Sequence, residues 1–174
     1  MTVALTQAVV EIERHVAAFG WDQPARLYAL VDTAALARSE PQLAKELGLA
    51  PEDGAATTLT PIEQDEIPNE TPIDDFLAGI AWPDPVLGCA IVLERLMLPP
   101  AAEAEMPTTG TDEEIATWVA ERSDRQEVRI AVGVLRDGTR ESVLRLREKD
   151  SDLEVLSGAD LVPGLAEALR ATFA

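Results

Sequence analysis

Acidic side chains between residues 49 and 85 are the part of this chain whose types and spacing could carry out chemistry. Carboxylate oxygens bind hard cations, and two carboxylates that face each other across a cleft can act as acid and base in hydrolysis. Several acids of this proline-rich stretch lie close together in the sequence, with a tryptophan downstream. The candidate interaction surface comprises Glu63, Gln64, Asp65, Glu66 and Trp82.

The spacing of these acids matches no calcium-binding loop. Two related segments, Thr60–Glu63 and Thr71–Asp74, each have a threonine, then a proline, and an acid three positions after the threonine. This pattern is typical of a helix start, because the threonine caps the helix, proline fits its first turn and the acid favours its positive end. We therefore predict two short helices, and we assign no metal, cofactor or catalytic residue.

The single cysteine and the single histidine do not indicate a catalytic or zinc site. Cys89 lies in an apolar run, where a buried free thiol is expected. His15 lies beside the apolar stripe of a predicted helix and is interpreted as a boundary residue. A conventional zinc site needs more cysteines and histidines than the chain has. Glycine-rich phosphate loops and the Gly-x-Ser-x-Gly elbow are also absent from the sequence.

The formal net charge of −18 makes nucleic acid an unfavourable partner, because phosphate binding depends on Lys and Arg. The charge is uneven: no Lys or Arg occurs between Lys45 and Arg95, whereas most basic residues lie between 122 and 149. Two interpretations stay open. The acids either keep the protein soluble or form a surface for a protein partner that is itself basic.

No apolar stretch is long enough to span a bilayer, and no basic region precedes an apolar signal core at the N-terminus. We therefore expect a cytoplasmic protein that is not embedded in a membrane. A length of 174 residues fits one domain over 1–174, with an acidic, proline-rich region of loops and short helices at about 49–85. The oligomeric state stays open, with a homodimer as one option.

Hydrophobic periodicity predicts helices near both ends of the chain. The first has one apolar stripe, formed by Leu5, Val9, Ile12, Val16 and Phe19. The last is expected over Leu161–Phe173, and Thr33–Leu47 is expected to form two short helices. A further capping pattern starts at Thr111 and precedes Trp118, which we expect to anchor in the core.

Apolar runs predict strands at Arg26–Asp32 and Val86–Leu98, with a short one at Leu153–Leu156. Between them, Glu127–Arg147 predicts a hairpin whose three-residue loop ends at Gly138 in the left-handed conformation. That register makes one face of the hairpin continuously apolar. The other face carries several arginines, so we expect it to be partly solvated. They are Arg129, Arg145 and Arg147.

Strands and helices do not alternate regularly along the chain. We therefore predict an α+β fold with a four- to five-stranded antiparallel or mixed sheet, and with the N- and C-terminal helices packed on one face.

Six blocks of the sequence resemble an actinobacterial family of uncharacterised conserved proteins, and together they cover nearly the whole chain. The blocks are Gly20–Leu27, Leu59–Glu66, Ile80–Pro83, Glu94–Pro100, Leu135–Ser142 and Asp160–Leu165. The resemblance implies no activity, cofactor or catalytic residue. We expect a non-enzymatic protein-binding or chaperone-like accessory module. The alternative is a carboxylate- or metal-dependent hydrolase that uses acids of the 63–84 region.

Overall fold

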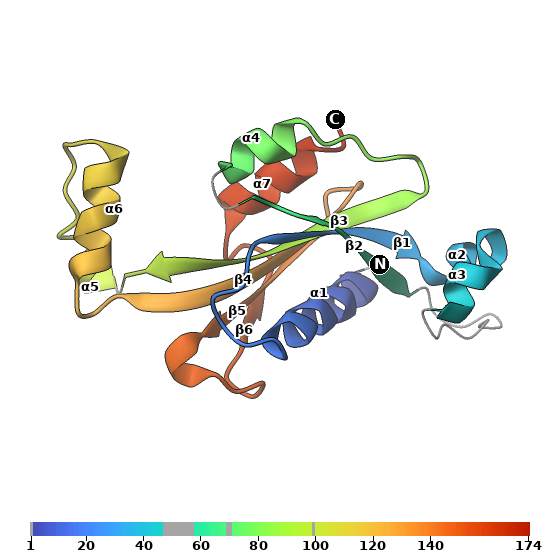
Figure 1. Cartoon of the computed structure of the whole chain (residues 1–174), viewed down its shortest axis with the longest axis horizontal. Helices are drawn as coiled ribbons and strands as arrows, with labels where there is room; N and C mark the ends of the chain where they lie inside the picture. The colour runs from blue at the N-terminus through green and yellow to red at the C-terminus, as the bar shows by residue number, and fades with distance from the viewer. Residues whose placement is uncertain (1, 47–57, 69–70, 99) are drawn as a thin grey trace.

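The computed structural model describes residues 2–46, 58–68, 71–98 and 100–174. These residues form one open antiparallel sheet of six strands in the order β2-β1-β3-β4-β5-β6 (Figure 1). The strands are β1 (Arg26–Asp32), β2 (Leu59–Glu66), β3 (Val86–Met97), β4 (Gln126–Leu135), β5 (Arg140–Leu146) and β6 (Leu156–Gly158). The helices are α1 (Thr2–Ala17), α2 (Thr33–Ser39), α3 (Pro41–Glu46), α4 (Ile73–Ala78), α5 (Pro100–Glu103), α6 (Asp112–Glu121) and α7 (Pro163–Ala171), with a 3₁₀ turn at Arg147–Lys149.

The α+β class is confirmed, but the sheet has six strands rather than four or five. The unpredicted strand is β2, where the helix expected from Thr60 and Pro61 is wrong. Pairing with β1 overrides the local capping pattern there, and proline is tolerated because β2 is an edge strand. The second predicted short helix is confirmed as α4, although Pro72 rather than Thr71 is its N-cap.

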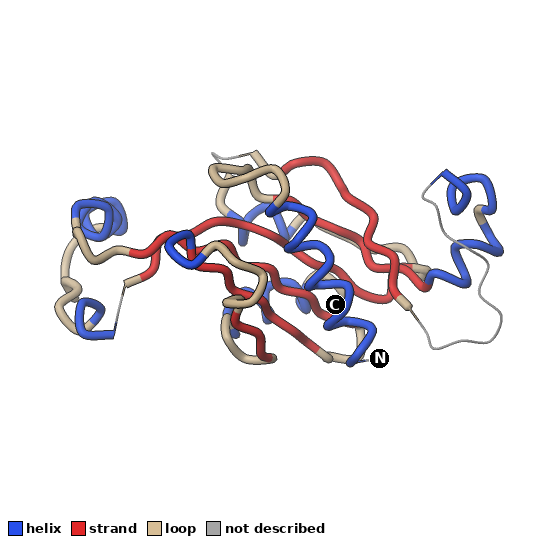
Figure 2. Tube along the Cα trace, turned by 90° about the horizontal axis from the view of Figure 1, so that it is seen from below, coloured by secondary structure: helices blue, strands red, loops and turns tan. Residues whose placement is uncertain are grey.

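The terminal helices pack on opposite faces of the sheet, so the prediction of one shared face is wrong. Figures 1 and 2 show α1 on one side and α4 and α7 on the other. Alternate residues of β1 supply the two cores: Tyr28 and Leu30 belong to the core under α1, whereas Leu27 belongs to the core under α7. The central strands are buried on both faces, so each face needs a helix to exclude water.

A glycine in β4 allows α1 to approach the sheet closely. A Cβ atom at Gly133 would lie 2.6 Å from Cγ2 of Val9 and 3.0 Å from Cδ1 of Leu5. The predicted stripe of α1 is buried from Leu5 to Val16, but Phe19 follows the end of the helix and remains 54% exposed.

The predicted hairpin register is confirmed, with Ile130 opposite Leu144 and Val128 opposite Leu146. Gly138 ends the loop with a φ of 94°, in the left-handed region. Its backbone N–H donates to the Leu135 carbonyl at 2.9 Å. The short strand after the hairpin lies at Leu156–Gly158, slightly later than predicted.

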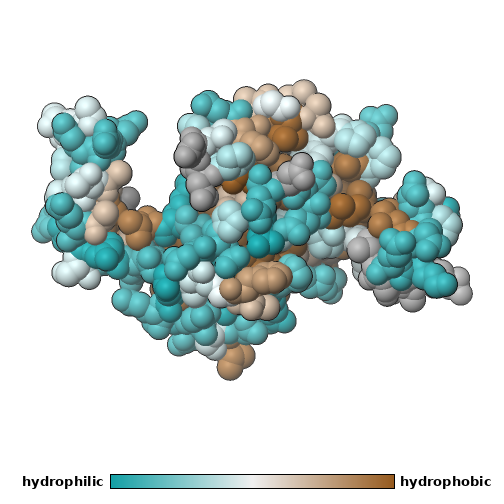
Figure 3. Space-filling model, in the orientation of Figure 1, coloured by the Kyte–Doolittle hydropathy of each residue, from teal (hydrophilic) through white to brown (hydrophobic). Residues whose placement is uncertain are grey.

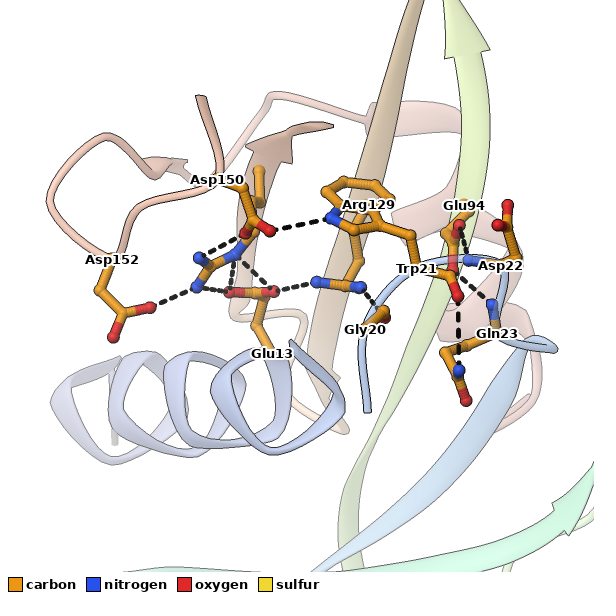
Figure 4. Close-up of polar contacts among 10 residues, drawn as sticks. Glu13, Gly20, Trp21, Asp22, Gln23, Glu94, Arg129, Asp150 and Asp152 are labelled. Atoms are coloured by element: carbon orange, nitrogen blue, oxygen red, sulfur yellow. Dashed lines mark hydrogen bonds and ion pairs between the residues drawn. The ribbon is translucent and has the colours of Figure 1, made fainter. Parts of the chain in front are cut away.

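The predicted arginine face of the hairpin is dry at Arg129 and Arg145, which are buried, and solvated only at Arg147, which is exposed. Arg129 and Arg145 face each other across β4 and β5, and α1 covers both. Glu13 of α1 lies between them: Oε1 accepts from Arg145 Nη2 at 2.6 Å, and Oε2 accepts from Arg129 Nη1 at 3.3 Å (Figure 4). The guanidinium of Arg129 also stacks 4.3 Å from the ring centroid of Trp21. This ionic cluster joins α1 to the sheet.

Helices α5 and α6 form a lobe that stands away from the body at the ends of β3 and β4, and its visible surface is mostly hydrophilic (Figures 1 and 3). The predicted cap is confirmed, because Thr111 and Glu114 form a capping box. The prediction for Trp118 is wrong: α6 has no buried residue, and Trp118 stacks with Arg122 at 4.9 Å.

In the described parts of the chain, none of the helices has the length and apolar character required to cross a lipid bilayer.

Candidate functional site

The predicted acidic residues lie on β2, the edge strand beside β1. Glu63 is opposite Tyr28 and Glu66 is opposite Arg26, so Gln64 and Asp65 together oppose a single residue of β1. This arrangement is a β-bulge. Gln64 turns its amide back to donate to the Ile62 carbonyl at 3.0 Å. The side chain of Asp65 lies outside the described part of the structure.

A proline, a bulge and exposed acids are devices by which edge strands avoid pairing with other chains. β2 has all three, because Pro61 lies near its start and Glu63 and Glu66 are exposed. Strand addition at this edge is therefore disfavoured. A partner that binds here would contact the side chains of β2 rather than extend the sheet.

Trp82 does not lie with these acids. It packs on the α7 side of the sheet, where its ring stacks on Phe173 with centroids 6.1 Å apart. Its Nε1 donates to Oγ1 of Thr172 at 2.9 Å. Glu63 lies opposite Tyr28, whose side chain belongs to the other face. The structure thus separates the predicted surface into an acidic edge and an anchor for the C-terminal helix.

Next to Glu63 the structure has a cavity of about 480 Å³, a volume within the range of small-ligand pockets. Four elements line it: α1, β1, β2 and α3. Its lining residues are Glu11, Ile12, His15, Tyr28, Leu43, Pro61, Ile62 and Glu63. Apolar side chains therefore form much of the wall, and acids approach from two sides.

Tyr28 is the buried polar residue of this cavity. Its side chain is 4% exposed, and its hydroxyl has no hydrogen-bond partner among the described residues. Burial is the main reason that the pKa of Tyr28 rises to about 12. The hydroxyl is therefore protonated at neutral pH and can both donate and accept a hydrogen bond.

Charges of both signs lie around the hydroxyl. Glu63 accepts a hydrogen bond from Arg26 Nη1 at 2.7 Å, so these two charges partly compensate each other. After burial, the Glu63 carboxylate raises the pKa of Tyr28, whereas Arg26 lowers it through both its charge and its side-chain interaction with the hydroxyl. Glu11 adds a second carboxylate from α1, and His15 lies exposed nearby on the same helix.

Sequence reasoning identified Glu63 but missed Tyr28 and Glu11. The signal for Tyr28 was present, because it is the chain's single tyrosine in a strand otherwise composed of apolar residues between Arg26 and Asp32. Glu11 gave no signal. Exposed acids are common on helices, so the sequence does not single out Glu11. Only the packing of α1 against β2 places it at the cavity.

Cys89 is confirmed as a buried free cysteine. Burial raises the pKa of its thiol to about 12, which the hydroxyl of Thr172 partly offsets, so the nucleophilic thiolate is strongly disfavoured. In the described residues, no group of three or more His, Cys, Asp or Glu side chains could hold a metal ion.

The fold and the cavity define an α+β domain with an open six-stranded antiparallel sheet and a ligand-sized cavity beside one edge strand. The chain belongs to the PPA1309-like protein family, whose sequence model matches residues 5–174. The family is uncharacterised, as the resemblance of the sequence blocks implies. No curated protein and no solved structure matches the chain.

Proposed function

We propose that this protein is a non-enzymatic binding module that recognises a protein partner through the acidic β2 edge and the cavity beside it. One observation carries the proposal: the cavity is lined by Tyr28, whose buried hydroxyl has no hydrogen-bond partner among the described residues. An unpaired buried polar group is unfavourable, so a ligand group that hydrogen-bonds to it would bind with a net gain.

A polypeptide fits this surface because the cavity is continuous with a strand whose side chains are exposed and acidic. The partner is expected to be basic, in line with the absence of Lys and Arg between Lys45 and Arg95. A chaperone-like accessory role, a cytoplasmic location, an actinobacterial origin and the option of a homodimer belong to the same proposal.

The alternative function, a carboxylate- or metal-dependent hydrolase, has no observation in its favour among the described residues. The acids of β2 do not meet a second set of ligands there. Trp82, which was expected near them, lies on the other face of the sheet.

Affinity purification from cells of the source organism tests the proposal. The bait is either the wild-type chain or a variant with Glu63→Gln, Asp65→Asn and Glu66→Gln. A matched control carries Glu121→Gln, Glu148→Gln and Glu154→Gln, which remove the same charge from exposed positions elsewhere. All three baits are first shown to be folded by circular dichroism and melting.

We expect a set of proteins that the wild type and the control retain and the β2 variant loses, as measured by quantitative mass spectrometry. If the β2 variant retains the same proteins as the wild type, the acids serve solubility alone and the proposal fails.

A further inference from the structure

We infer that the cavity between α1 and β2 receives a lysine side chain of the protein partner. The inference rests on the proposed function and adds the chemical group that is recognised. It follows from the shape of the cavity, its unpaired hydroxyl and the arrangement of its acids.

The walls suit the aliphatic part of a lysine. Ile12 of α1, Leu43 of α3 and Pro61 of β2 supply apolar surface from three sides. Lysine has a four-carbon stem that packs on apolar surface while its charged end reaches polar groups. A cavity of about 480 Å³ leaves space for such a chain.

The polar groups suit the ammonium end. Glu11, Tyr28 and Glu63 belong to α1, β1 and β2, so three acceptors approach from three elements. An ammonium has three rotatable N–H donors and needs no common plane of acceptors. The Tyr28 hydroxyl would accept one of these hydrogen bonds and so obtain the partner that it otherwise lacks.

Arginine fits this arrangement less well. Its planar guanidinium is best matched by a carboxylate that offers both oxygens side by side. In Glu63, Oε1 already accepts from Arg26 Nη1 at 2.7 Å. One oxygen of that carboxylate therefore remains, which suits a single N–H donor of an ammonium.

Anionic groups are disfavoured by the same residues. Two carboxylates line the cavity, and its lining among the described residues contains no Lys or Arg. Arg26 is already engaged by Glu63 and by the ring of Phe19, 5.2 Å from its guanidinium carbon. Charge thus distinguishes lysine from an acidic side chain of the same length.

Titration of the full chain with a lysine probe tests the inference. The probe is Nα-acetyl-lysine N-methylamide, and binding is followed by amide chemical shifts in NMR spectra. Two control probes keep the aliphatic stem but remove the charge: the corresponding norleucine and Nε-acetyl-lysine amides. A single amine is a small ligand, so weak binding in the millimolar range is expected.

We expect the lysine probe to bind at least about fivefold more tightly than either neutral probe. Tyr28→Phe, which removes one oxygen, is expected to weaken lysine binding by about three- to tenfold. Glu11→Gln is expected to act in the same direction, whereas Glu121→Gln on the distant α6 leaves binding unchanged. Melting curves establish that each variant is folded.

Equal binding of the lysine and norleucine probes overturns the inference, as does the absence of lysine binding to the folded wild type. So does lysine binding that Tyr28→Phe leaves unaltered. These failures are distinct from failure of the proposed function. If the β2 variant still loses its partners in the purification experiment, the binding module stands and only the lysine assignment falls.

Discussion

Glu13 and Arg145 form an ion pair across the α1–β5 interface, with 2.6 Å between Oε1 and Nη2, and both side chains are at most 3% exposed. Burial alone would lower the pKa of Arg145, but the hydrogen bonds that it donates to Glu13 and Asp152 outweigh burial and raise it. The guanidinium therefore remains charged in the folded protein. Arg129 shares the same carboxylate, and Arg145 also pairs with Asp150 and Asp152, so Glu13 is the carboxylate common to the two buried cations.

Replacing Glu13 tests how far the packing of α1 depends on this carboxylate. Glu13→Gln leaves two buried guanidiniums without their shared counter-charge, so we expect a loss of about 3 kcal/mol in the free energy of unfolding. Glu11→Gln removes the same charge from an exposed position of the same helix and should change stability by less than about 0.5 kcal/mol. Urea unfolding measures both. Equal midpoints for the two variants would contradict the role assigned to Glu13.

Two glycines provide opposite tests of backbone conformation. Gly138 has a φ of 94°, where a side chain is strained, so Gly138→Val should destabilise the fold by about 1 kcal/mol or more. Gly164 lies in α7, and a Cβ atom there meets nothing within 4 Å. Gly164→Ala should therefore stabilise the protein by about 0.5 kcal/mol. An unchanged urea midpoint for the Gly138 variant would reject the bulged hairpin loop.

Removing the Tyr28 hydroxyl should not weaken the fold, because that group has no hydrogen-bond partner among the described residues. At neutral pH we expect Tyr28→Phe to leave the free energy of unfolding unchanged or to raise it by up to about 1 kcal/mol. A loss of more than 1 kcal/mol in chemical unfolding, about the value of one hydrogen bond, would show that the hydroxyl has a structural partner.

The raised pKa of Tyr28 predicts that the wild type and Tyr28→Phe differ in stability at alkaline pH. The pKa of Tyr28 is about 12 in the folded protein, against an ordinary value of 10.0, so the folded state holds the proton more tightly than the unfolded state. Stability from this group is complete below pH 10 and is lost as the pH rises toward 12. The wild type should therefore lose more stability than Tyr28→Phe in this window. Tyrosinate absorbance of the single tyrosine measures the folded pKa directly.

Cys89 should resist alkylation while the protein is folded. Its side chain is fully buried, and burial raises the pKa of the thiol to about 12, so little thiolate is present and no reagent reaches it. Labelling with a maleimide at neutral pH should be slow in buffer and fast in urea. Equally rapid labelling in both conditions would contradict the burial of β3 under α7.

Local patterns in the sequence determined the hairpin register, the ends of β1 and the capping box at Thr111. Each of these depends on residues close together in the chain. A turn needs Gly138 at positive φ, a cap needs an acid three positions after Thr111, and a strand needs a short apolar run. Interactions of this kind act over a few residues, so the sequence alone reports them.

Long-range packing decided the rest. Thr60 and Pro61 match a helix start locally, yet they form β2 because β1 offers an unpaired edge. Arg129 and Arg145 were predicted to lie on a partly solvated face, whereas α1 covers both and supplies Glu13 as their shared counter-charge. The cavity combines Glu11, Tyr28 and Glu63 from three elements. The spacing of these residues along the chain does not predict that they lie together, because their proximity depends on which face of the sheet each helix covers.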